Sequence, residues 1–127
     1  MSILNAFTTQ FVQFCDELSH TFPEEKDIKM ATESIKGAKK INPRLILNLF
    51  VEYVYKPCSQ AIYEKNITYI RRHMQDTISN QFNDMMAMLT IFDKHWETMG
   101  PKNQDIIWQY LKVLCLLSEK ATAASSV

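Results

Sequence analysis

The chain has 127 residues, a length that fits one domain with its own core. Apolar residues make up 46% and charged residues 22% of it, near the averages of globular proteins, which argues against global disorder. Fourteen basic side chains balance fourteen acidic ones, so the sequence lacks the basic surplus that is typical of nucleic-acid-binding proteins. Two glycines and four prolines are too few for a fold of strands and tight turns. Composition therefore favours helices.

Two helices are predicted in the first third of the chain. Apolar residues recur every three or four positions over residues 3–20, which predicts a first amphipathic helix. Pro23 suits the first turn of a second helix, because a proline there loses no hydrogen bond. The acidic residues that follow Pro23 favour a helix N-terminus, and the thin apolar stripe behind them ends near residues 39–40.

The middle of the chain opens with a clear boundary at Asn42-Pro43, where asparagine can cap a third helix and proline can begin it. Pro57 is expected to end this helix, since the residue before a proline avoids the helical region. Residues 58–75 are expected to form a short helix and a connector. Within them, residues 67–70 have strand-like composition and no evident partner strand.

A seam of seven apolar residues follows at alternating spacings of four and three: Ile78, Phe82, Met85, Leu89, Phe92, Trp96 and Met99. This repeat predicts one continuous helix packed lengthwise on another, closed by Gly100-Pro101. A last helix is expected over residues 102–120, followed by a flexible tail over residues 121–127. The sequence thus predicts an all-α, single-domain bundle of five to six helices with short connections, spanning residues 1–120.

No residue spacing in the sequence is typical of catalysis, of a cofactor or of a metal ion. The three cysteines form no CxxC pair and lie beside apolar neighbours, which favours free thiols in a reducing compartment. His95 lies two residues from both Asp93 and Glu97, so the three side chains point to different faces of a helix, and a surface or boundary histidine is favoured over a ligand or general base. We expect no enzyme activity, no cofactor and no metal. Neither a secretory signal nor a membrane span is predicted.

The last two helices are more apolar than one packed face requires. Trp108 and Leu116 lie beyond opposite edges of the apolar arc of the last helix, and Met86, Met88 and Ile91 lie outside the seam of the helix before it. Such helices are either central in their bundle or pressed against another chain. We predict that these five residues contact protein partners in a homo- or hetero-oligomeric assembly.

A nucleic-acid contact is the alternative. The stretch over residues 65–73 contains Lys65, Arg71 and Arg72 beside the aromatic Tyr69, and a second basic cluster lies over residues 36–44. Short charge runs on helices usually only solvate a surface, and the chain has no net positive charge. An accessory factor with weak nucleic-acid contact through residues 65–73 is therefore the second hypothesis.

Several short motifs resemble a family of small helical proteins from large nucleocytoplasmic DNA viruses of algae and protists. They are Phe22-Pro23-Glu24, Asn42-Pro43-Arg44, Trp96, Ile107-Trp108-Gln109-Tyr110-Leu111 and Leu116-Leu117-Ser118. The resemblance spans roughly residues 7–118 and carries over no functional residue, because the family has no established activity. It implies a minor capsid or other virion protein, or else a replication or transcription factor. Either would reside in the virion or in the cytoplasm of the infected host cell.

Overall fold

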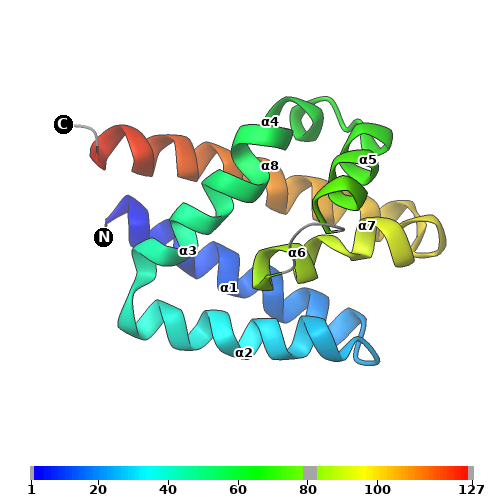
Figure 1. Ribbon diagram of the computed structural model, residues 1–127, viewed down its shortest axis with the longest axis horizontal. Coiled ribbons are helices and arrows are strands. Elements are labelled where there is room, and N and C mark those ends of the chain that lie inside the picture. Colours follow the sequence, from blue (N-terminus) through cyan, green and yellow to red (C-terminus); the bar gives the residue numbers. More distant parts are fainter. Residues whose placement is uncertain (1, 79–82, 126–127) are drawn as a thin grey trace.

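The structure is a computed structural model that describes residues 2–78 and 83–125. Every regular element in these residues is a helix, which confirms the predicted all-α single domain. Figure 1 shows three long helices, α1 (Ile3–Thr21), α2 (Lys26–Ile41) and α8 (Gly100–Ser125), with the shorter helices between Pro43 and Thr98 packed across them. One apolar cluster runs through the whole domain, and no helix of the described residues is long and apolar enough to cross a membrane.

Helix α1 agrees with the prediction, whereas α2 begins three residues later than predicted, because residues 22–25 form a turn that leaves Pro23 and Glu24 outside the helix. In α1 (Ile3–Thr21), the Ser2 hydroxyl caps the helix by accepting a hydrogen bond from the Asn5 amide at 3.0 Å. Its buried face carries three phenylalanines: the rings of Phe7 and Phe11 pack edge-on against Phe50 of the third helix, and the Phe14 ring packs edge-on against Phe11. After the corner at residues 22–25, α2 (Lys26–Ile41) packs along α1 through a thinner stripe that includes Ile28 and Ile35.

The prediction that Pro57 ends the third helix is wrong. Helix α3 (Pro43–Phe50) continues through a π-helical turn, η1 (Val51–Tyr55), directly into α4 (Lys56–Tyr63). In a regular α-helix the ring of Pro57 would clash with the carbonyl group of Tyr53, four residues earlier. The π turn changes the hydrogen-bonding register just before the proline, with the Lys56 amide bonded to the Val51 carbonyl. The chain therefore bends without ending its helix.

Residues 67–70, predicted as part of a connector, instead begin α5 (Ile67–Ile78). Lys65 adopts a left-handed backbone conformation that turns the chain, and the Asn66 side chain then caps the new helix by accepting from the Tyr69 amide at 3.1 Å. Ile70 and Met74, one helical turn apart, are buried. The capping residue and this apolar face outweigh the strand-like composition.

The seam predicted as one helix is divided into short pieces: α6 (Asp84–Leu89), α7 (Ile91–Lys94) and the 3-10 turn η2 (Trp96–Thr98). Asn83 starts α6 as a cap, with its side chain accepting from the Met86 amide at 3.0 Å. Helix α7 ends at His95, whose φ of −124° is not helical. Phe82 lies outside the described residues. The seam positions Met85, Leu89, Phe92 and Trp96 are nevertheless all buried.

Helix α8 (Gly100–Ser125) is longer than predicted. Gly100 has a φ of 83°, which favours glycine, and the helix begins there. The tail expected from residue 121 is helical through Ser125, because Ala121 packs into the core and extends the buried face of the helix by one more turn. The boundary expected at residue 120 therefore lies inside α8.

Candidate functional site

Four of the five predicted interaction residues belong to the core, and three of these lie on α6 and α7. Met86, Met88 and Ile91 are at most 1% exposed, so they are not a docking surface of the folded chain, and that part of the prediction is corrected. For Met86 and Met88 the physical reason is that α6 packs against α2, α5 and α7, and every residue from Met85 to Leu89 is buried. Methionine suits this position because its flexible side chain fills irregular gaps between helices.

The other two predicted residues, Trp108 and Leu116, lie on α8 and differ in burial. Trp108 is 7% exposed and packs edge-on against Trp96, with ring centroids 5.1 Å apart, and beside Phe92 at 5.9 Å. It is a core residue, so its assignment to a surface is also corrected. Leu116 is 45% exposed and remains a candidate.

The basic residues of the nucleic-acid alternative do not form one free patch. The Arg71 guanidinium donates from Nε to the Phe92 carbonyl at 2.6 Å and pairs through Nη1 with Glu97 at 2.8 Å. Lys65 lies 3.7 Å from an Asp105 carboxylate oxygen. Of the three, Arg72 is exposed and makes no ion pair with a described residue. Arg71 thus binds α5 to α7 and η2, a role that sequence alone did not reveal.

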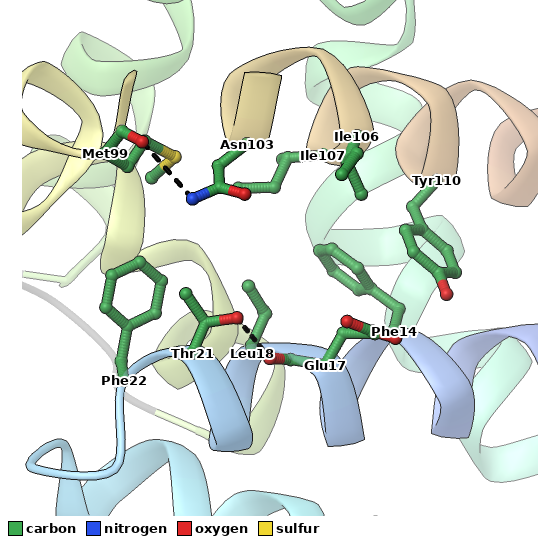
Figure 2. Close-up of a pocket in the computed structure, with 10 residues that line it drawn as sticks. All are labelled: Phe14, Glu17, Leu18, Thr21, Phe22, Met99, Asn103, Ile106, Ile107 and Tyr110. Carbon is green, nitrogen blue, oxygen red and sulfur yellow. Dashed lines mark hydrogen bonds between the residues drawn. The ribbon is translucent and has the colours of Figure 1, made fainter. Parts of the chain in front are cut away.

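An apolar groove between α1 and α8 is the strongest candidate site, and we call it the α1–α8 groove. Figure 2 shows its deeper part, where side chains of the two helices face each other across a cavity of about 40 Å³. A shallower hollow of about 220 Å³ continues it along α8 and shares Ile106 and Tyr110. The two parts are lined by Gln10, Phe14, Glu17, Leu18, Thr21, Phe22, Met99, Asn103, Ile106, Ile107, Gln109, Tyr110 and Val113.

The exposed apolar surface at this groove comes from α8. Ile106 is 39% and Val113 is 42% exposed, and Leu116 lies one turn beyond Val113 on an adjoining part of the same helix. At about 100° per residue the three fall within an arc of about 80°. Ile106 and Val113 could not be singled out from the sequence, because both belong to the apolar arc of the last helix, which is wide enough to face a core. The apolar arc of α8 is wider than the part of its surface that the neighbouring helices cover.

Among the described residues that line the groove, Glu17 is the one charged side chain. Two neighbouring polar side chains bond to the backbone four residues earlier, since the Thr21 hydroxyl donates to the Glu17 carbonyl and the Asn103 amide to the Met99 carbonyl (Figure 2). Burial raises the pKa of Tyr110, and the negative charge of Glu17 adds to this effect. An apolar partner surface with a basic side chain opposite Glu17 would match these properties.

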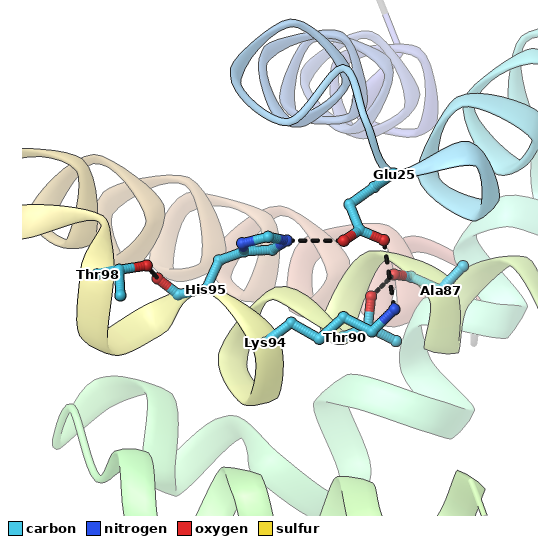
Figure 3. A network of polar contacts seen from close by, with 6 residues as sticks. All are labelled: Glu25, Ala87, Thr90, Lys94, His95 and Thr98. Carbon is cyan, nitrogen blue, oxygen red and sulfur yellow. Dashed lines mark hydrogen bonds and ion pairs between the residues drawn. The ribbon is translucent and has the colours of Figure 1, made fainter.

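A polar cluster lies next to the groove, at the corner between α1 and α2 (Figure 3). His95 Nε2 lies 2.9 Å from Glu25 Oε1, and Lys94 Nζ lies 3.3 Å from Glu25 Oε2. The hydrogen bond with His95 is the main reason why the pKa of Glu25 is lowered, and the Lys94 contact lowers it further. His95 thus lies at a boundary and joins α7 to the corner before α2.

Glu24 lies beside this cluster. Three groups that can bind a metal ion lie within 4.8 Å of one another here: the carboxylates of Glu24 and Glu25 and the His95 ring. Carboxylate and imidazole groups can bind zinc or manganese. The Lys94 ammonium contacts Glu25, however, and would repel a cation there. Both Glu25 oxygens are also already engaged, so the geometry favours an ion-paired structural contact.

The cysteines are poorly suited to nucleophilic chemistry. Burial raises the pKa of Cys58 to about 11 and that of Cys115 to about 12, and it raises the pKa of Cys15 further. The reactive form of cysteine is the thiolate, which is scarce at neutral pH when the pKa is this high. The three thiols therefore behave as small apolar groups of the core.

Comparison with models of protein families, with curated proteins and with solved structures finds no match to this chain.

Proposed function

We propose that this protein is a non-enzymatic interaction protein that docks a partner chain on the α1–α8 groove. The observation that carries the proposal is the exposure of Ile106, Val113 and Leu116 on one side of α8, next to an apolar cavity. Clustered exposed apolar side chains beside a groove are typical of protein-binding sites. Burying them against a partner would release about 25 cal/mol for each Å² of apolar surface.

The groove fits a partner helix. Ile106, Tyr110 and Val113 follow one another at helical spacing along about 10 Å of α8, which suits apolar side chains at every third or fourth position of a partner helix. A lysine or arginine on that helix would pair with Glu17. The resemblance to proteins of large DNA viruses makes a virion the assembly to test first, with this chain as a minor capsid or other structural component.

The nucleic-acid alternative has less support. Arg71 already binds Glu97 and a backbone carbonyl, and Lys65 is near Asp105, so only Arg72 of the predicted residues is free of such contacts among the described residues. An accessory role in viral replication or transcription would need a different basic surface.

Two exposed apolar positions allow a matched experiment. Leu116→Asp puts a charge at the proposed interface, while Met30→Asp puts the same charge on an exposed position of α2, away from the groove. Viruses carrying each variant would be purified, and quantitative mass spectrometry would count the copies of this chain per particle against the major shell protein. We expect a fixed copy number for the unchanged protein and for Met30→Asp, and a reduced one for Leu116→Asp.

This test includes a folding control and two outcomes that would contradict the proposal. Circular dichroism of the purified variants should show unchanged helix content, which separates lost docking from lost folding. Absence of the unchanged protein from particles would contradict the virion role. Equal incorporation of Leu116→Asp and Met30→Asp would contradict docking through α8.

A further inference from the structure

A second groove lies between α1 and α2 and shares no lining residue with the α1–α8 groove; we call it the α1–α2 groove. It consists of two hollows of about 330 and 560 Å³ that meet at Glu33 and Lys36. Most of its lining residues are polar or charged, and they include Asp16, Lys29, Glu33, Lys36, Lys39 and Lys40. The groove includes part of the basic cluster of residues 36–44 and extends from it toward the N-terminus of α2.

Four lysines face two carboxylates in this groove. Lys36 pairs with Asp16 at 2.8 Å, and Lys39 Nζ donates to the Thr9 hydroxyl at 3.2 Å. Lys29 and Lys40 are exposed, and neither ammonium group has an ion pair or hydrogen bond with a described residue. Lys29, Lys36 and Lys40 are spaced by seven and four residues, so they lie along one side of α2. The groove therefore has a net positive charge with two free ammonium groups near its ends.

No contact among residues 2–78 and 83–125 explains why position 37 is a glycine. It lies inside α2, where glycine is less favourable than alanine, and its φ is not in the left-handed range. A Cβ atom built on Gly37 would meet no atom of the described residues within 4 Å, so none of the described helices needs the space. Gly37 lines the larger hollow between Lys36 and Lys39. The missing side chain leaves α2 backbone accessible beside the lysines.

We propose that the α1–α2 groove binds an acidic, extended segment of a partner polypeptide. The lysines supply charge complementarity, and Gly37 lets the backbone of the bound segment approach α2 closely. Eleven residues of helix separate Lys29 from Lys40, or about 16 Å, which matches about five residues of extended chain. Asp16 and Glu33 stand among the lysines and disfavour a uniformly charged phosphate backbone, which is why the groove suits a polypeptide better than a nucleic acid.

Fluorescein-labelled hexaglutamate is a direct probe, with hexaglutamine as the uncharged control. Binding to the purified protein would be measured by fluorescence anisotropy in low salt and mapped by amide chemical shifts. We expect hexaglutamate, and not hexaglutamine, to bind and to shift the amides of α2 around Gly37. Lys40→Glu should weaken binding about tenfold, whereas Lys112→Glu, the same change on an exposed lysine of α8, should change it less than twofold.

The variant Gly37→Ala tests whether Gly37 serves binding or only the structure of α2. Alanine favours the helix, so this variant should melt at a higher temperature than the unchanged protein while binding hexaglutamate at least threefold more weakly. Equal affinity of Gly37→Ala and the unchanged protein would overturn the proposal. Amide shifts confined to other surfaces would do the same, as would tighter binding of a dT20 oligonucleotide to the groove than of hexaglutamate.

Discussion

The Phe22 ring stacks on the His95 imidazole, with ring centroids 4.3 Å apart and an angle of 20° between the planes. Phe22 also lines the α1–α8 groove, and His95 contacts Glu25. One corner of the chain, between α1 and α2, is therefore held by an aromatic stack and an ion pair at once. Because Phe22 belongs to both arrangements, the polar cluster of Figure 3 supports one end of the groove of Figure 2.

Glu25→Gln should cost about 2 kcal/mol of unfolding free energy at pH 6, since hydrogen bonds to charged partners contribute about 1.5–3 kcal/mol. The pKa of Glu25 is lowered in the folded protein, so its stabilising effect is present above the pKa of the unfolded chain and is lost as pH falls through the folded value. Urea unfolding of both proteins from pH 6 to pH 3 should show the difference shrinking. Glu24→Gln is the matched control. A difference that stays constant with pH would contradict this role of Glu25.

Trp108→Ala and Leu116→Ala should differ strongly although both residues lie on α8. Trp108 packs against Trp96 and Phe92 in the core, so its truncation should cost about 3–5 kcal/mol. Leu116 is exposed, and its truncation should stay within about 0.5 kcal/mol. Chemical denaturation followed by circular dichroism measures both. Similar losses for the two variants would mean that Leu116 is buried in the folded protein.

The elements that the sequence predicted well have one clear apolar face or begin at a proline. Helix α1 is of the first kind and the start of α3 at Pro43 of the second, although the Asn42 side chain makes no capping hydrogen bond. The end of the third helix was predicted wrongly at Pro57 because an α-helical register was assumed. The π turn before Pro57 removes the clash of its ring with the preceding turn, which is what makes a proline end a helix. The apolar seam was predicted as one continuous helix because its residues recur at spacings of four and three. That spacing determines which side chains are buried, but Asn83 and His95 determine where the helices begin and end.

The candidate site was harder to predict for a reason of packing. A helix with a wide apolar arc is consistent with a central position or with a free surface, and the neighbours decide which part is covered. Helix α6 is enclosed by α2 and α5, so Met86 and Met88 are core residues, whereas α1 leaves Ile106 and Val113 of α8 exposed. The contact between Glu25 and His95, seventy residues apart, carries no signal in one sequence.

Arg71 and Arg72 are adjacent and identical in type, so they form a matched pair. Arg71→Ala removes a hydrogen bond to the Phe92 carbonyl and an ion pair with Glu97, which should cost about 2 kcal/mol of unfolding free energy. Arg72 is exposed, and its change to alanine should cost less than about 0.5 kcal/mol. Urea unfolding at neutral pH measures the two losses. Equal stabilities would show that Arg71 does not hold α5 against α7 and η2 in solution.

Tyr55 and Tyr63 both donate hydrogen bonds to Glu119 Oε1, at 2.6 and 3.1 Å, and so bind η1 and α4 to α8. The bond to the carboxylate raises the pKa of Tyr55 to about 12. Above pH 10 the unfolded chain loses tyrosine protons that the folded protein keeps, so stability should fall as pH rises toward 12. Glu119→Gln should lower the pKa of Tyr55, seen as earlier tyrosinate absorbance, and Glu64→Gln should not. An unchanged titration in Glu119→Gln would mean that the carboxylate does not hold the two rings.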